Sequence, residues 1–243
     1  MRDFAGKRYW LIGASEGLGA ALAAELARAG AHLILSARSG DRLREVAATL
    51  PGPADILPLD VADRDSIASA AARAGPVDGM VYLAGLYWPM RAQEWNAEQA
   101  EAMADVNFTG LVRMLGAVVP EMVALDRGHI VVIGSLAGFR GLPGAIGYGA
   151  AKAGTMSLAE SLHADLKDTG IAVQLANPGF IRTRLTAKND FNMPFLMEPE
   201  AAARAVFRHM RTRRFATSFP RPFSWIFRLG ALLPDALYFR LFA

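Results

Sequence analysis

The chain has 243 residues, of which 53% are hydrophobic and 20% are charged, and it contains no cysteine. This composition excludes a disordered chain, and the lack of cysteine excludes a disulfide framework, a thiol nucleophile and a cysteine-based zinc site. The net charge is +3, yet residues 204–243 hold eight arginines and one aspartate, so the rest of the chain is acidic.

Short apolar runs alternate with longer helical patterns along the whole chain. Strands are expected at RYWLIG, AHLILSA, DILPL, GMVYLAG, HIVVIGS, IAVQLAN and FATSF. The predicted helices cover about 18–29, 41–50, 63–74, 96–125, the stretch from Tyr148 to about 168, and 199–212. Such alternation indicates βαβ units. We therefore predict an α/β fold: a Rossmann-like, doubly wound parallel sheet of about seven strands with helices on both faces, in a single domain over 1–243.

Two absences bear on location and on metal binding. No apolar run approaches the roughly 18 residues of a transmembrane helix, and the N-terminus leaves no room for a signal peptide. The sequence therefore predicts a cytoplasmic protein. The four histidines are scattered without ligand spacing, so no metal is expected.

A glycine-rich turn, GASEGLG, joins the first predicted strand to the first predicted helix. Its glycines, Gly13, Gly17 and Gly19, permit a tight turn and close approach of a pyrophosphate, and the helix N-terminus offers unpaired N–H groups. Ligands of such sheets bind beyond the carboxyl ends of the strands. Because Gly13, Ser135 and Pro178 each follow directly on a predicted strand, we expect their loops to gather at one edge.

Tyr148 and Lys152 are four residues apart in GYGAAKAG, which places both on one face of a helix. A fixed cation beside a phenol favours the phenolate and would lower the tyrosine pKa from its usual value near ~10. Taken alone, the pair also fits an ordinary amphipathic helix with a snorkelling lysine. Ser135, thirteen residues earlier, and the glycine turn favour chemistry instead.

Seven motifs in order and register resemble the short-chain dehydrogenase/reductase family in its single-domain form. They are GASEGLG, Asp60-Val61, Leu83-Ala84-Gly85, Asn107 in DVNFTG, Ser135, YGAAK, and NPGFIRT at 177–183. Two positions depart from the common pattern. Ile12 replaces a usual threonine, and Tyr82-Leu83 stand where two asparagines are frequent, so local hydrogen bonding between these loops is in doubt.

The resemblance implies a catalytic tetrad of Asn107, Ser135, Tyr148 and Lys152. Tyr148 would exchange the proton, Ser135 would bind the substrate oxygen, Lys152 would lower the tyrosine pKa and hold the nicotinamide ribose, and Asn107 would hold a water. The implied cofactor-binding residues are Gly13, Ser15, Glu16, Gly17, Leu18, Gly19, Arg38, Ser39, Asp60, Val61, Ala84, Gly85, Tyr148, Lys152, Pro178, Gly179, Ile181 and Thr183.

The end of the second predicted strand bears on the choice between NADP(H) and NAD(H). NAD-preferring relatives usually have an acid at the position of Ala37, whereas here Arg38 follows, and its guanidinium could pair with a 2′-phosphate. Arg38 could instead merely cap the strand end or stack on adenine. Ser39 could add a hydroxyl, while Glu16 argues mildly for NAD(H). We predict that NADP(H) is favoured over NAD(H).

The C-terminal quarter is predicted to recognise the substrate and partners. Residues 184–198 are expected to form a substrate lid, with Phe191, Met193, Phe195, Leu196 and Met197 available to line a pocket or to pack on the lid's own core. The apolar and basic tail, 219–243, suits a subunit contact, a cover over the pocket, or peripheral membrane contact.

The leading interpretation is an NADP(H)-dependent oxidoreductase acting on a small carbonyl or alcohol substrate, apolar or lipid-like, as a homodimer or homotetramer. The alternative is a non-catalytic NAD(P)-binding sensor or scaffold with the same fold, against which the intact tetrad argues. A nucleic-acid-binding function through the arginine-rich end is disfavoured by the seven motifs and the acidic body, so no nucleic acid is expected as a partner.

Overall fold

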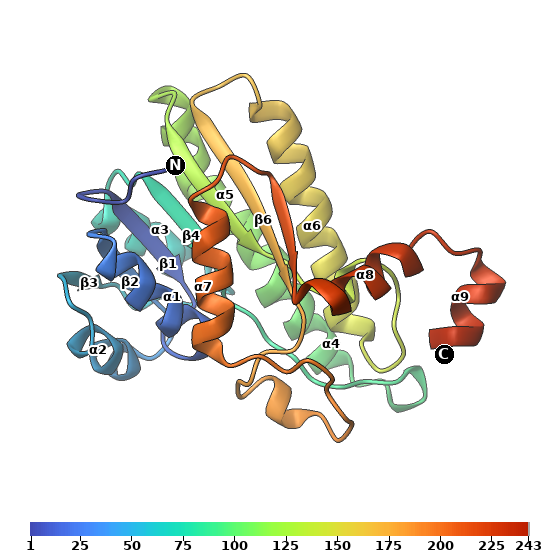
Figure 1. The fold of residues 1–243 in the computed structure, drawn as a ribbon. Helices are drawn as coiled ribbons and strands as arrows, with labels where there is room; N and C mark the ends of the chain where they lie inside the picture. The colour runs from blue at the N-terminus through green and yellow to red at the C-terminus, as the bar shows by residue number, and fades with distance from the viewer. Residues whose placement is uncertain (243) are drawn as a thin grey trace.

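The computed structural model describes residues 1–242, whose elements are arranged as a layered α/β protein (Figure 1). Within them, seven parallel strands form one sheet in the order β3-β2-β1-β4-β5-β6-β7. The strands are β1 Arg8–Ile12, β2 His32–Ser36, β3 Ala54–Ile56, β4 Gly79–Tyr82, β5 Gly128–Ile133, β6 Ile171–Pro178 and β7 Ala216–Phe219. Each overlaps a predicted strand, so the predicted fold class is confirmed.

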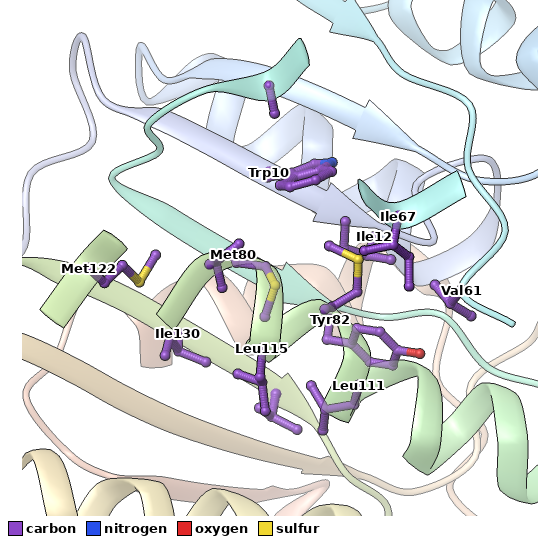
Figure 2. Packing of buried hydrophobic residues seen from close by; sticks show 14 of the residues in the cluster. Trp10, Ile12, Val61, Ile67, Met80, Tyr82, Leu111, Leu115, Met122 and Ile130 are labelled. Carbon is purple, nitrogen blue, oxygen red and sulfur yellow. The ribbon is translucent and has the colours of Figure 1, made fainter. Parts of the chain in front are cut away.

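Helices cover both faces of the sheet because successive strand residues point to opposite faces. Trp10 and Ile12 belong to one buried cluster, shown in Figure 2, while Tyr9 and Leu11 belong to the other. The first cluster is covered by α3 Arg64–Ala74, α5 Gly110–Ala124 and α6 Ile146–Leu166. The second is covered by α1 Gly17–Arg28, α2 Gly40–Ala48 and α7 Pro199–Met210.

The long helix predicted over 96–125 is divided into three parts. It runs as α4 Ala97–Ala104, a π turn η2 Asp105–Thr109, and α5. By length and composition the stretch Ala97–Ala124 could cross a membrane. However, Leu111, Met114 and Val118 are buried in the core against the sheet, so it is a core helix of the fold.

The strand order reverses between β1 and β4, which lie side by side although β2 and β3 intervene in the chain. The backbone N–H of Leu83 donates to the carbonyl of Ile12 (2.8 Å), so a backbone hydrogen bond joins the two chain segments where they leave the sheet. Beyond β7, helices α8 Arg221–Gly230 and α9 Asp235–Phe242 extend away from the sheet (Figure 1).

Candidate active site

One large cavity opens beyond the carboxyl ends of the strands, where the strand order reverses. It has a volume of about 1090 Å³. All of the predicted catalytic and cofactor-binding residues line it, from Gly13 in the first loop to Thr183 after β6. This is the position at which doubly wound sheets bind their ligands.

The glycine turn is shaped by close contacts that leave no room for side chains. Gly13 has φ +98°, and a Cβ there would lie 2.6 Å from the backbone nitrogen of Ala84. At Gly19 a Cβ would lie 2.0 Å from the carbonyl oxygen of Gly13. The side chain of Glu16, at the N-cap of α1, makes no capping hydrogen bond. The first-turn N–H groups are therefore available to an anion, as a pyrophosphate requires.

Tyr148, Lys152 and Ser135 converge at the inner end of the cavity. Tyr148 lies in the first turn of α6 and Lys152 one turn later, as the spacing predicts. The Lys152 ammonium is buried, donates to the carbonyl of Ile133 (2.8 Å) and lies 5.8 Å from the centre of the Tyr148 ring. A Cβ on Gly138, in the short helix η3 Leu136–Gly138, would lie 2.9 Å from the backbone of Lys152. This tight packing brings Ser135 to the start of α6.

Burial governs the ionisation of the pair in the protein without cofactor. It raises the pKa of Tyr148, with the Ser135 hydroxyl acting in the opposite direction. Burial also lowers the pKa of Lys152 to about 8. Desolvation favours the neutral form of each group. The lowering of the tyrosine pKa by Lys152 and the oxidised nicotinamide stays a prediction.

Asn107 is fully buried in the π turn, and its side chain is satisfied by the backbone. Its amide donates to the carbonyls of Leu86 and Met103 (both 2.8 Å), and its oxygen accepts from the N–H of Leu86 (3.1 Å). The side chain thus ties the loop after β4 to the helix. The role of Asn107 in holding a water stays a prediction.

The opposite end of the cavity carries a cluster of arginines around one glutamate. Glu16 pairs with Arg184 (2.6 Å) and with Arg42 (3.5 Å), and Arg38 lines the same region. Ser39 caps α2 by accepting from the N–H of Arg42 (3.4 Å). Asp60 also lines the cavity, and the three arginines outweigh Glu16 and Asp60 together, so this region carries a net positive charge.

Several residues that line the cavity were not among those expected from the sequence. Arg42, Tyr87, Trp88, Arg184 and Lys188 line the cavity. The aromatic pair directly after Leu86 and the second arginine four residues after Arg38 could have indicated them.

Within the segment expected to form the lid, residues 184–188 line the cavity, whereas the later apolar residues do not. Phe191 and Phe195 are 49% and 55% exposed and contact Phe180 and Phe223 outside the cavity. Met197 packs on the core instead.

Comparison with known proteins places this arrangement among dehydrogenases. Residues 7–193 match the family described as short chain dehydrogenase. An uncharacterized oxidoreductase of Myxococcus xanthus is 37% identical over 235 residues, covering 94% of this chain and 93% of that protein. A short-chain dehydrogenase from Streptomyces avermitilis has a TM-score of 0.85 at 26% identity, over 98% of this chain and 96% of that one. An alcohol dehydrogenase from Thermococcus sibiricus, complexed with 5-hydroxy-NADP, has a TM-score of 0.79 at 26% identity, over 88% and 95%.

Proposed function

Because this chain belongs to the short-chain dehydrogenase/reductase family and is an oxidoreductase, we propose that it interconverts a carbonyl and an alcohol with NADP(H). The observation that carries this proposal is the convergence of Tyr148, Lys152 and Ser135 at one end of a cavity whose other end is positively charged. One cavity therefore contains both a proton donor and a region suited to binding phosphate.

The chemistry divides between the cofactor and the protein. The reduced nicotinamide, when bound, supplies the hydride that reaches the carbonyl carbon. Tyr148 donates its phenolic proton to the carbonyl oxygen, so the product is an alcohol, and the oxidative direction reverses both transfers. Since burial raises its pKa, Tyr148 remains protonated at neutral pH and suits the role of donor.

Ser135 and Lys152 assist that proton transfer. The Ser135 hydroxyl oxygen accepts from the N–H of Ala137 (3.1 Å), so its own proton can be donated to the Tyr148 oxygen or to a substrate oxygen beside it. Lys152 holds a buried ammonium one helical turn from Tyr148. A positive charge there favours the phenolate after the proton has left.

The arginine cluster supports NADP(H) over NAD(H). Glu16 would repel a 2′-phosphate if it stood alone, but its ion pairs with Arg42 and Arg184 offset that charge. Arg38 adds a further guanidinium next to Ala37, where an acid would otherwise hold the ribose hydroxyls.

We expect Arg38→Asp to shift the ratio of kcat/KM for NADPH over NADH by about tenfold or more toward NADH. Arg44→Asp is the matched control, because Arg44 lies in the helix that follows Arg38, α2, and does not line the cavity. Unchanged selectivity in the Arg38 variant would remove the case for NADP(H).

The cavity wall beside Tyr148 supports an apolar substrate. The Tyr87 ring meets the Tyr148 ring edge-on at 5.1 Å, and Leu86, Trp88 and Leu185 line the same space. Segment 184–198 would act as the lid through its residues 184–188. A panel of long-chain and cyclic carbonyls and alcohols, followed at the NADPH absorbance, tests the function. Tight NADPH binding without turnover of any class of compound would favour a sensor instead.

We further propose a homodimer or homotetramer. Its support is the exposure of Val112 and Val123 on α5, at 44% and 53%. Light scattering coupled to size exclusion tests it, and a monomer at micromolar concentration would contradict it.

A further inference from the structure

The C-terminal arm, residues 221–242 with helices α8 and α9, has an apolar surface that the rest of the described chain leaves uncovered. On α8, Trp225, Ile226 and Leu229 are 54%, 48% and 56% exposed. At 100° per residue these three side chains share one side of the helix. Phe223 and Ser224 are buried on the other side. One side of α8 therefore holds it to the body, and a separate apolar side faces outward.

Contacts of Arg140 and Gly141 with the middle of the arm hold it in this orientation. The Arg140 guanidinium donates to the carbonyl of Leu233 (2.6 Å), pairs with Asp235 and lies 4.1 Å from the centre of the Tyr238 ring. Tyr238 is buried and donates from its hydroxyl to the carbonyl of Gly141 (2.8 Å). No residue of 221–242 lines the cavity, so the arm does not cover the candidate active site in this structure.

The outward surface is also positively charged. Arg221, Arg228 and Arg240 are exposed, and none of them forms an ion pair within residues 1–242. The Arg228 guanidinium lies over the Trp225 ring at 5.5 Å. The arm's one acid, Asp235, is already paired with Arg140. An occupant of this surface must therefore accept apolar side chains and supply negative charge.

These requirements distinguish between a second copy of the chain and a membrane. In a two-fold interface where this patch meets itself, the arginines of both copies would come together without acids to balance them. A bilayer with anionic headgroups receives Trp, Ile and Leu side chains at its interface and attracts the arginines beside them. We propose that the arm binds the surface of an anionic lipid membrane.

The arm adjoins the outer side of the lid through an aromatic cluster. Phe223, at the start of α8, contacts Phe180 and Phe195 with ring centres 5.7 and 5.6 Å apart. Phe195 is itself exposed, as is Phe191, which contacts Phe180. Docking of the arm would therefore bring the lid of the cavity close to the lipid surface.

The test is sedimentation of the purified full-length protein with vesicles of phosphatidylcholine, with and without phosphatidylglycerol. We expect binding to the anionic vesicles that weakens as salt is raised. Exchanging two exposed apolar residues, in the double variant Trp225→Ser/Leu229→Ser, should weaken that binding at least about tenfold. Trp95→Ser is the matched control, because Trp95 is 58% exposed and lies outside the arm, and it should bind as the wild type does.

A second variant tests the charge separately. Arg221→Gln/Arg228→Gln should remove most of the preference for anionic over neutral vesicles. Equal binding of the wild type to both vesicles, or no binding to either, would overturn the proposal. A lower oligomer mass in the Trp225→Ser/Leu229→Ser variant, with no vesicle binding by the wild type, would assign the surface to a second copy and overturn it equally. Because no step measures turnover, the outcome is independent of the proposed oxidoreductase activity.

Discussion

Buried titratable side chains lie at both ends of the sheet, but their surroundings differ. Near the amino ends of β1 and β5, the Tyr9 hydroxyl lies 2.8 Å from Nδ1 of His129, and Arg2 lies 2.6 Å from Nε2 of the same ring. Gln174 completes this cluster, because its side-chain oxygen lies 2.8 Å from Nε2 of His129 and its amide nitrogen is within hydrogen-bond distance of three backbone carbonyls. At the carboxyl ends, Tyr148 and Lys152 face the cavity.

The comparison shows what separates a structural polar cluster from a candidate site. Burial shifts pKa values at both ends: it raises those of Tyr9 and Tyr148, and it lowers those of His129 and Lys152. A shifted pKa alone therefore does not identify chemistry. The difference is that the side chains around His129 are hydrogen-bonded to one another, whereas Tyr148 and Lys152 line a cavity that a ligand can enter.

The largest expected effect is at the cavity end. Lys152→Met should lower turnover by at least about a hundredfold, because the positive charge beside Tyr148 is lost. Its folded pKa of about 8 lies below the unfolded value, so the unfolded state binds the proton more tightly and the charge destabilises the fold at pH 7. The free energy of unfolding of the variant should therefore be equal or higher, by on the order of 3 kcal/mol at most.

Turnover and urea denaturation of the Lys152 variant would be compared with those of Lys167→Met, an exposed lysine at the C-cap of the same helix. The control should match the wild type in both. A Lys152→Met protein that keeps its turnover, or that loses stability along with activity, would contradict the assignment of Lys152 to a functional site and not to a structural cluster.

An acid-dependent loss of stability is expected at the opposite end. Burial lowers the pKa of His129 to about 3, so below pH 6.5 the unfolded state binds a proton that the folded state does not. Stability should fall as pH decreases, by on the order of 3 kcal/mol between pH 7 and pH 4 from this group. His129→Gln should lose that portion of the pH dependence and keep its turnover.

Urea midpoints at pH 7 and pH 4 measure this effect. His163→Gln is the control, since His163 stacks on Phe215 at the other face and takes no part in the cluster. A His129 variant with the acid sensitivity of the wild type would show that the cluster is not what limits stability in acid.

The smallest expected effect is at Tyr82, which is buried near the cavity but bonded to the protein. Its hydroxyl donates to the carbonyl of Val106 in the π turn (2.6 Å). Tyr82→Phe should cost about 1 kcal/mol of stability and change turnover by no more than a few-fold. A large loss of turnover at unchanged stability would show that a buried side chain whose hydrogen bond is made within the protein can still be functional, and would contradict the distinction drawn above.

Much of the fold and most of the candidate site could be predicted from local patterns. The alternation of apolar runs with helical periods predicted the sheet, because buried parallel strands and amphipathic helices have different periods. The cavity residues after β1, β4, β5 and β6 were predictable because parallel strands end at one edge. The four-residue spacing predicted that Tyr148 and Lys152 share one helix face, and Ser135 together with the family's motifs assigned the pair to the site.

The remaining features depend on contacts that the sequence pattern does not encode. The π turn that interrupts the helix at Asn107 accompanies bonds to Leu86, which lies in another loop. The pairing of Glu16 with Arg184 joins residues 168 positions apart. The direction of the Tyr148 pKa shift reflects burial, which only the tertiary packing determines.

The most direct test compares two tyrosines that lose the same atom. Tyr148→Phe and Tyr9→Phe would be measured side by side for NADPH oxidation with an active carbonyl compound, for NADPH binding, and for urea denaturation. We predict that Tyr148→Phe abolishes turnover, by about 10²–10⁴-fold, with cofactor affinity and stability nearly intact. Tyr9→Phe should retain turnover and lose about 1–2 kcal/mol of stability. Retained turnover in Tyr148→Phe would contradict the proposed mechanism.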